Sequence, residues 1–158
     1  PGTGLGFGWV HQAYKSEPRV VVPFLDFDGR PVGFQGRAVG EVDTRKRWVG
    51  PTNPPGHFWS TVGVFDTRSD DHYWIICEGP SDALCAVGVG VSAVCARGAS
   101  LAQNAATVSV LIDGLTGKRV VLAGDNDRSG ETFNTELGEA LIGANVETHR
   151  LVYPGASR

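Results

Sequence analysis

The second half of the chain alternates short apolar runs with segments of helical periodicity. Strands are predicted at the apolar runs, residues 73–77, 92–97, 119–123 and 146–152. Helices are predicted between them, at residues 81–89, 101–111 and 129–142. Short apolar strands that alternate with helices indicate a parallel sheet with right-handed crossovers, buried on both faces. We therefore expect an α/β domain over residues 69–158.

The first part of the chain has a different pattern. Residues 20–26 and 32–39 read as two strands joined by a turn at 28–30, which predicts a hairpin. Residues 45–66 are rich in proline, glycine, tryptophan and phenylalanine, a composition that excludes a long helix and indicates irregular β structure. The expected fold class is α/β, a Rossmann-like parallel sheet flanked by helices, preceded by a smaller β-rich subdomain at residues 1–68.

Acidic residues follow the first predicted strand of the α/β domain. Glu78 closes the strand, and Asp82 falls in the first turn of the next helix, on the same side. Ser81 or Asp82 could simply cap that helix. Capping does not explain Glu78, because a charged residue at the end of an apolar strand needs a partner. Open parallel sheets bind ligands beyond the carboxyl ends of their strands, where these residues are expected.

A second acidic pair, Asp125 and Asp127, follows the strand predicted at 119–123. Two carboxylates one residue apart can share a hard divalent cation through their oxygens. The alternative is a polar turn in which Ser129 caps the following helix. That alternative accounts for one aspartate better than for two, since like charges at this spacing repel each other without a cation between them.

Two other motifs have well-known counterparts. Residues 125–136 come close to an EF-hand calcium loop, but such a loop follows a helix, and this one follows a predicted strand. Residues 26–29 resemble the nucleophile motif of haloacid-dehalogenase-type phosphatases, but Arg30 stands where those enzymes have threonine or valine. We therefore interpret Asp26 as part of a hairpin turn.

Taken together, the acidic motifs resemble the TOPRIM domain that primases, topoisomerases and some nucleases share. The pattern is a strand-terminal glutamate in an EGxxDAL context at residues 78–84, followed by a strand-terminal DxDxxG at 125–130. Residues 96–100 resemble the glycine-containing loop that lines the same site. Residues 151–155 resemble the strand and turn that close the domain in primases.

Among TOPRIM proteins, the chain resembles bacterial and phage DNA primases. Residues 22–37 are similar to the hairpin that precedes TOPRIM in those enzymes, and residues 47–51 are similar to their basic stretch KYLNSP. Trp48 and Gly50 replace the usual tyrosine and asparagine of that stretch. The tyrosine-bearing domain of topoisomerases and the four-cysteine motif of recombination mediators are not visible. The zinc-binding module of primases is also absent, so template-sequence recognition is not assigned to these residues.

The primase resemblance implies a DNA-directed RNA polymerase that joins NTPs into short RNA primers on a single-stranded DNA template. It implies a site for Mg²⁺ or Mn²⁺ in which Asp125 and Asp127 are ligands, Asp82 assists directly or through water, and Glu78 is a ligand or the general base. A replicative helicase, fused or separate, is the implied protein partner. The alternatives are a TOPRIM nuclease and a non-catalytic module that holds nucleic acid or a nucleotide.

Basic and aromatic residues are candidates for contacts with nucleic acid. Arg37 and Arg47 match the family pattern, although either could be a solvated surface charge. Arg97 and Arg128 flank the acidic motifs, and either could contact phosphate or balance the carboxylates. Trp48 could stack on a base or pack in the core. The full set of nucleotide or nucleic-acid candidates is Arg30, Arg37, Arg47, Trp48, Arg97 and Arg128.

Composition changes this interpretation little. The 158 residues, 41% hydrophobic and 20% charged, are typical of a globular protein, and a net charge of −3 leaves room for a local basic groove. Cys77, Cys85 and Cys95 lack paired zinc spacing, so we expect buried free thiols in a reducing cytoplasm. The apolar runs are shorter than the roughly 20 residues of a membrane span. The absence of methionine predicts a fragment, with no signal peptide in view.

Overall fold

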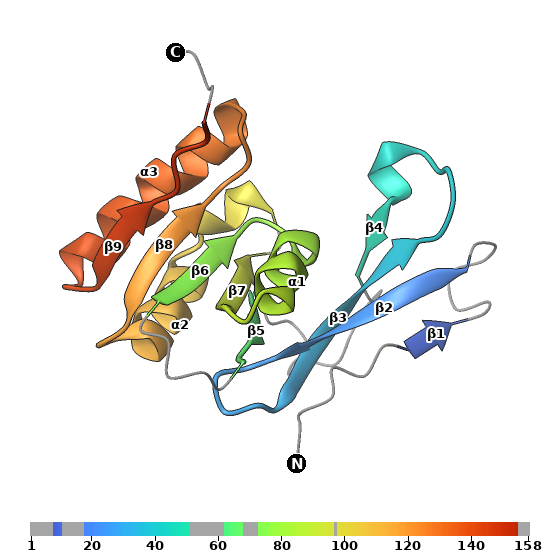
Figure 1. Cartoon of the computed structure of the whole chain (residues 1–158), viewed down its shortest axis with the longest axis horizontal. Helices are drawn as coiled ribbons and strands as arrows, with labels where there is room; N and C mark the ends of the chain where they lie inside the picture. The colour runs from blue at the N-terminus through green and yellow to red at the C-terminus, as the bar shows by residue number, and fades with distance from the viewer. Residues whose placement is uncertain (1–7, 11–17, 51–61, 68–72, 97, 155–158) are drawn as a thin grey trace. The chain divides into compact units, whose positions relative to one another are not determined.

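A computed structural model describes residues 8–10, 18–50, 62–67, 73–96 and 98–154 of the chain (Figure 1). Its two compact units are Pro1–Ser60 and Thr61–Arg158. In the first unit the described elements are β1 (Gly8–Val10), β2 (Arg19–Leu25), β3 (Pro31–Ala38), the 3₁₀ helix η1 (Thr44–Lys46) and β4 (Trp48–Val49). The strands are antiparallel neighbours in the order β4, β3, β2, β1.

The predicted hairpin of the first unit is confirmed, with each strand beginning one residue earlier than expected. Val22 and Phe24 alternate toward the buried side of β2. The turn is fastened by Asp26, whose Oδ1 accepts hydrogen bonds from the backbone N–H of Asp28 at 2.9 Å and of Arg30 at 2.8 Å. Asp26 is therefore a turn residue, as the comparison with the phosphatase motif indicated.

The second unit holds the α/β domain. Its elements are β5 (Val62–Phe65), β6 (Tyr73–Cys77), α1 (Pro80–Gly88), β7 (Ser92–Ala96), the 3₁₀ helix η3 (Ala99–Gln103), α2 (Ala105–Leu115), β8 (Arg119–Ala123), α3 (Arg128–Gly143) and β9 (Glu147–Arg150). The strands lie in the order β5, β7, β6, β8, β9. β5 is antiparallel to β7, and the other pairings are parallel, as predicted.

The helix predicted at 101–111 is wrong in its bounds. The structure has η3 first and then α2, which begins four residues later than expected. The break lies at Asn104, because its side-chain Oδ1 accepts a hydrogen bond from the backbone N–H of Thr107 at 3.1 Å. An asparagine that caps a helix starts a new helix at that point rather than extending the old one.

The core of the second unit lies on both sides of its sheet. Figure 1 shows α1 on one face, and α2 and α3 on the other. Ile76 and Leu122 of the central strands are buried, as are Leu111 of α2 and Phe133 of α3. Burial of each such side chain contributes about 1.5–3 kcal/mol to the free energy of folding. This packing holds the ends of the strands in fixed positions. No helix in the described ranges has the length and apolar character needed to cross a membrane.

The cysteine prediction is correct in part. Cys77 and Cys95 are buried thiols, as expected. Cys85 is exposed on α1, which corrects the expectation that it is buried. The reason is its place on the helix: α1 buries Ala83 and Ala86, and position 85 does not share their face.

Candidate active site

The acidic residues lie where the strand order of the sheet reverses. From β6 the chain passes through α1 to β7 on one side, and β8 pairs with β6 on its other side. Cys77 of β6 and Ala123 of β8 are partners in register, so the loops that follow them start side by side. This is the place where open α/β sheets bind ligands, and it carries Glu78 on one loop and Asp125 on the other.

The connection between β6 and α1 is short, and neither Glu78 nor Asp82 is the N-cap of the helix. Gly79 is the N-cap of α1 and makes no side-chain capping hydrogen bond, and Pro80 is the first helical residue. The capping alternative for Ser81 or Asp82 is therefore wrong, because neither residue is the N-cap. Asp82 lies in the first turn, where its negative charge is favoured by the helix dipole.

The loop between β8 and α3 uses one of its carboxylates in the fold. Asp127 is the N-cap of α3, and its Oδ1 accepts a hydrogen bond from the backbone N–H of Gly130 at 2.9 Å. The capping alternative placed this role at Ser129, two residues too late. Asp127 keeps its second carboxylate oxygen for another partner. The EF-hand alternative is excluded, because this loop follows β8 rather than a helix.

The β8–α3 loop is tightly packed around two glycines. A Cβ at Gly130 would lie 2.0 Å from the backbone oxygen of Asp125, and a Cβ at Gly124 would lie 2.6 Å from the backbone oxygen of Gly130. The buried Asn134 accepts a hydrogen bond from the backbone N–H of Gly124 at 2.9 Å. These contacts require glycine at the last position of DxDxxG and at the position just before the motif, since a side chain at either would collide with backbone atoms.

Two hydrogen bonds tie the strand-end loops together. Glu78 Oε1 accepts from the backbone N–H of Asp125 at 2.8 Å, and the backbone carbonyl of Glu78 accepts from the N–H of Gly98 at 2.9 Å. The loop after β7, which the sequence placed beside the site, therefore meets the same glutamate. Glu78 joins the loops that follow β6, β7 and β8.

The carboxylates interact electrostatically. Partial desolvation raises the pKa of Glu78 despite the Asp125 N–H bond, and the charges of Asp125, Asp127 and Asp82 raise it further. Partial desolvation first, and then the charge of Asp125, raise the pKa of Asp82, although its side chain is largely exposed. The neighbouring aspartates therefore make Glu78 and Asp82 harder to ionise, which is typical of an acidic site without a balancing positive charge.

The donor set fits a hard divalent cation by its chemistry. Carboxylate oxygens are the ligands that Mg²⁺ and Mn²⁺ prefer, and the four acidic residues lie on adjoining loops. Within the part of the chain that the structure describes, no three His, Cys, Asp or Glu side chains are already arranged as a metal-binding group. Glu78 Oε1 instead accepts the Asp125 N–H. Binding would therefore use bridging water or a rotation of a side chain.

Tyr153 is a site residue that the sequence analysis missed. Its phenol O–H donates to the backbone carbonyl of Gly124 at 2.9 Å, and its side chain is partly buried. Burial, followed by the charges of Asp125 and Asp82, raises the pKa of Tyr153. The sequence analysis matched residues 151–155 only to the strand and turn that close the domain, because Tyr153 reaches the site through the pairing of the last strand with β8.

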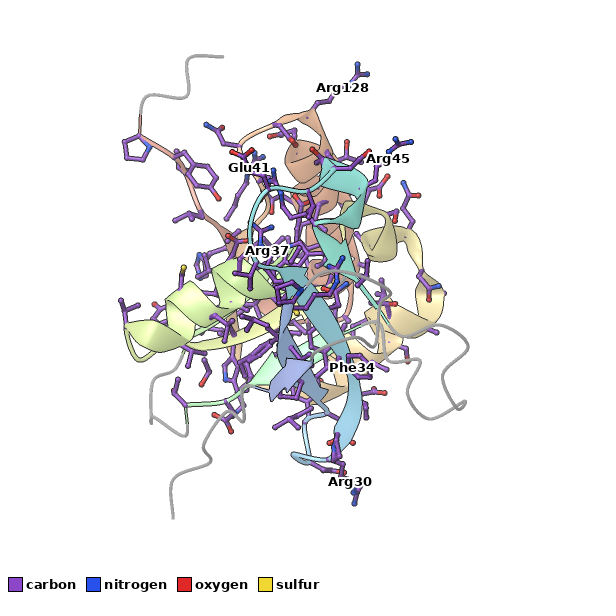
Figure 2. The ribbon with its side chains drawn as sticks, turned by 90° about the vertical axis from the view of Figure 1, so that its right-hand side faces the viewer. Arg30, Phe34, Arg37, Glu41, Arg45 and Arg128 are labelled. Atoms are coloured by element: carbon purple, nitrogen blue, oxygen red, sulfur yellow. The ribbon has the colours of Figure 1, made fainter. Side chains whose placement is uncertain are left out.

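The predicted nucleic-acid residues have different surroundings. In the first unit, the guanidinium of Arg37 lies 5.5 Å from the ring centroid of Trp48 on the neighbouring strand. Arg30 pairs with Asp28 at 2.6 Å, which satisfies part of its charge locally. Arg47 is exposed. Figure 2 shows Arg30 at the hairpin turn and Arg37 farther along β3.

In the second unit, Arg128 is exposed at the first position of α3 and extends away from the helix (Figure 2). It borders an open cavity of about 380 Å³, lined also by Ser100, Gln103, Ser129 and Thr132. Arg97, another predicted nucleic-acid candidate, lies outside the described residues. Phosphate contacts by either arginine stay predictions.

Comparison with known proteins agrees with this fold. Residues 75–157 match the family described as Toprim-like. The DNA primase of Thermotoga maritima is 32% identical over 136 residues, which covers 81% of this chain. The chain spans 23% of the length of that relative. The expected fold class and TOPRIM resemblance are confirmed.

Solved structures give the same result for the fold. The zinc-binding and RNA polymerase domains of Aquifex aeolicus primase superpose with a TM-score of 0.67 at 23% identity, covering 92% of this chain and 38% of that one. The primase fragment of the bacteriophage T7 primase-helicase protein superposes with a TM-score of 0.68 at 16% identity, covering 95% of this chain and 59% of that one. The resemblance therefore extends beyond the α/β domain.

Proposed function

Because the chain belongs to the Toprim-like family, we propose that it is the nucleotide-joining core of a DNA primase. The observation that carries the proposal is the meeting of Glu78 and Asp125 at the carboxyl ends of the neighbouring strands β6 and β8. The relative from Thermotoga maritima, which is named DNA primase, supports primer synthesis over the other reactions of the family. The product we propose is a short RNA primer on single-stranded DNA.

We assign the carboxylates different duties. Asp125 is the principal metal ligand, since its carboxylate accepts no hydrogen bond from the residues the structure describes. Asp127 contributes the oxygen that it does not use to cap α3. Asp82 binds directly or through water, and Glu78 is either a ligand or the base that takes the proton of the primer 3′ hydroxyl. Bound Mg²⁺ or Mn²⁺ would supply the positive charge that stabilises the attacking and leaving oxygens.

The Arg37–Trp48 pair is the better candidate for contact with template or nucleotide in the first unit. A guanidinium held over an indole ring presents a flat cationic and aromatic surface, which suits a base and its phosphate together. Arg47 adds an exposed charge beside Trp48. Arg30 contributes less, because Asp28 already partners it. Arg128 and Arg97 are assigned to phosphates near the carboxylates.

The proposed partners follow from the proposed reaction. They are a single-stranded DNA template, NTPs, the RNA primer and a replicative helicase, for which the primase-helicase of bacteriophage T7 is the precedent among the similar structures. The cytoplasm, where replication takes place in bacteria, is the compartment we propose. Binding to template should weaken as salt rises, because arginine–phosphate contacts release counterions.

The test compares polymerisation with cleavage. The purified chain, and the longest natural protein that contains it, are incubated with NTPs, Mg²⁺ and single-stranded DNA, and separately with supercoiled duplex. We expect RNA oligomers from the first mixture, and a fall in their rate of about a hundredfold in Glu78→Gln, as for loss of a general base or ligand.

The control is Glu139→Gln, which makes the same change at an exposed position of α3 and should leave the rate unaltered. Nicking of the duplex that depends on Glu78, without any joining of NTPs, would replace the primase proposal with a nuclease.

A further inference from the structure

The peptide unit between Gly124 and Asp125 is held at both of its polar groups. Its carbonyl accepts the phenol O–H of Tyr153 at 2.9 Å. Its N–H, on Asp125, donates to Glu78 Oε1 at 2.8 Å. The described peptides include no cis bond, so the carbonyl and the N–H of this peptide point in opposite directions. Tyr153 and Glu78 therefore hydrogen-bond to opposite sides of one peptide plane.

The orientation of this peptide plane sets the direction of the Asp125 side chain. A peptide is rigid, so the Asp125 Cα–Cβ bond leaves the loop at an angle fixed by the plane and one torsion. The N-terminal side is fixed as well, because Asn134 accepts the Gly124 N–H at 2.9 Å from a buried position. The remaining freedom of the loop at this point is a rotation of the Gly124–Asp125 peptide, which Tyr153 and Glu78 oppose.

Tyr153 reaches this peptide from a separate part of the chain. The backbone N–H of Leu151 donates to the carbonyl of Leu122 at 2.9 Å, which continues the alignment of the last strand with β8 up to the loop. Tyr153 therefore arrives beside Gly124 as a consequence of strand pairing. Among the described residues, its hydroxyl donates to this backbone carbonyl and to no carboxylate, so it acts through the backbone.

We infer that Tyr153 is a positioning residue for the carboxylate site. Together with Glu78 it fixes the orientation of the Gly124–Asp125 peptide, and this orientation directs the Asp125 carboxylate toward the cation. We call this pair of hydrogen bonds the clamp. This inference rests on the proposed function, because it takes Asp125 to be a metal ligand. Hydrogen-bond partners that orient a ligand typically change metal affinity by about 10–100-fold when removed. Tyr153→Phe removes the hydroxyl and keeps the ring.

A matched control is available within the same unit. Tyr73 is also a tyrosine whose hydroxyl makes a hydrogen bond, accepting from Arg119 at 3.2 Å, at the opposite end of β6 from the site. Tyr73→Phe makes the same chemical change away from the carboxylates. If the loss of any tyrosine hydrogen bond in this unit were enough to weaken Mn²⁺ binding, both variants would show weaker binding.

The experiment first measures the Asp125–Glu78 hydrogen bond in metal-free protein and then measures the affinity for Mn²⁺. In metal-free protein, the amide resonance of Asp125 and its hydrogen-exchange rate report the bond to Glu78. Tyr153→Phe should shift that resonance and speed its exchange, and Tyr73→Phe should leave both unchanged. Titration with Mn²⁺, followed by electron paramagnetic resonance, should then show about tenfold weaker binding for Tyr153→Phe and wild-type binding for Tyr73→Phe.

Different failures separate the two claims. An unchanged Asp125 amide in Tyr153→Phe overturns the clamp. A shifted amide with wild-type Mn²⁺ affinity overturns the positioning role and leaves Tyr153 as a structural residue. If wild-type protein binds no Mn²⁺, the proposed metal site fails, and the positioning role fails with it, while the amide measurement still decides whether the clamp exists.

Discussion

The β6–α1 and β8–α3 loops have the same architecture, a strand end that turns into a helix, but they use their acidic residues differently. Between β6 and α1 a glycine is the N-cap of the helix, and neither Glu78 nor Asp82 takes that role. In the β8–α3 loop Asp127 caps the helix, Asn134 holds Gly124, and two glycines allow close backbone contact. Both loops contribute negative charge, but only the β8–α3 loop holds its carboxylates on a tightly packed backbone.

Glu78 is the residue that makes the two loops one site. It follows β6, yet its carboxylate accepts a hydrogen bond from the Asp125 N–H of the β8–α3 loop. Desolvation first, and then in part the charges of the neighbouring aspartates, raise the pKa of Glu78, so its carboxylate is harder to ionise here than in water. Carboxylates with perturbed pKa values are typical of functional sites.

The largest difference between the loops should appear on adding a methyl group. Gly130→Ala places a Cβ 2.0 Å from the Asp125 backbone oxygen, so we expect a loss of about 3 kcal/mol in the free energy of unfolding. Gly79→Ala meets nothing closer than the Asp82 carboxylate at 3.7 Å and should cost less than about 1 kcal/mol. Urea denaturation measures both. Equal losses would show that the loops do not differ in rigidity.

Removal of the capping carboxylate should have a smaller effect. Asp127→Ala should lower the free energy of unfolding by about 1 kcal/mol, because Gly130 N–H loses its acceptor. Asp127→Asn keeps a capping oxygen and should stay within about 0.5 kcal/mol of wild type while losing the charge. Asp82→Ala, which removes no N-cap, should also cost about 0.5 kcal/mol or less. A larger loss in Asp82→Ala than in Asp127→Ala would reverse the comparison.

The pH dependence of metal-free protein should distinguish the same loops. Glu78 and Asp82 have raised pKa values in the fold, so the folded chain holds their protons more tightly than the unfolded chain does. Their contribution to stability is present at low pH and is lost as pH rises through the raised values. The double variant Glu78→Gln with Asp82→Asn should therefore lose less stability than wild type between pH 4 and neutrality. Parallel curves from thermal melts would contradict the assignment.

The smallest expected effect is in thiol reactivity, which tests whether the end of β6 stays closed to solvent. Burial and the charges of Asp82 and Asp125 raise the pKa of Cys77 to about 12, so this thiol stays neutral and shielded at pH 8. Cys85 is exposed and Cys95 is buried. Iodoacetamide should modify Cys85 alone in the native chain, as read by mass spectrometry. Modification of Cys77 at the same rate would show that the end of β6 opens readily.

The sequence was sufficient for those parts of the site that depend on local pattern. Glu78 and Asp125 follow apolar strands, and parallel strands bring their carboxyl ends to one edge, so the meeting of the two was predictable. The exact alignment of the two strands could not be predicted, because no local sequence pattern encodes the pairing of Cys77 with Ala123. The break at Asn104 was missed because an asparagine inside an apolar helical pattern gives no warning of its capping bond.

The supporting residues were harder to predict. Asn134 and Tyr153 act on Gly124 from 10 and 29 residues away, through a helix and through a strand pairing. Their side chains carry no charge and occur in no acidic motif, so only the folded arrangement shows what they touch. The alternative interpretation of the loop placed the cap of α3 at Ser129 rather than at Asp127, because both residues are good caps and the choice depends on where the helix begins.

The most direct test of the account is primer synthesis by a variant in which the rigid loop keeps its shape but loses its charge. Asp125→Asn with Asp127→Asn retains the size of both side chains and the capping oxygen at position 127. The control is Asp113→Asn with Glu139→Gln, which removes the same charge from exposed positions of α2 and α3. The account predicts Mg²⁺-dependent RNA oligomers from wild type and control, and a rate about a thousandfold lower, or about 4 kcal/mol, in the loop variant. Synthesis at the wild-type rate by the loop variant would contradict it.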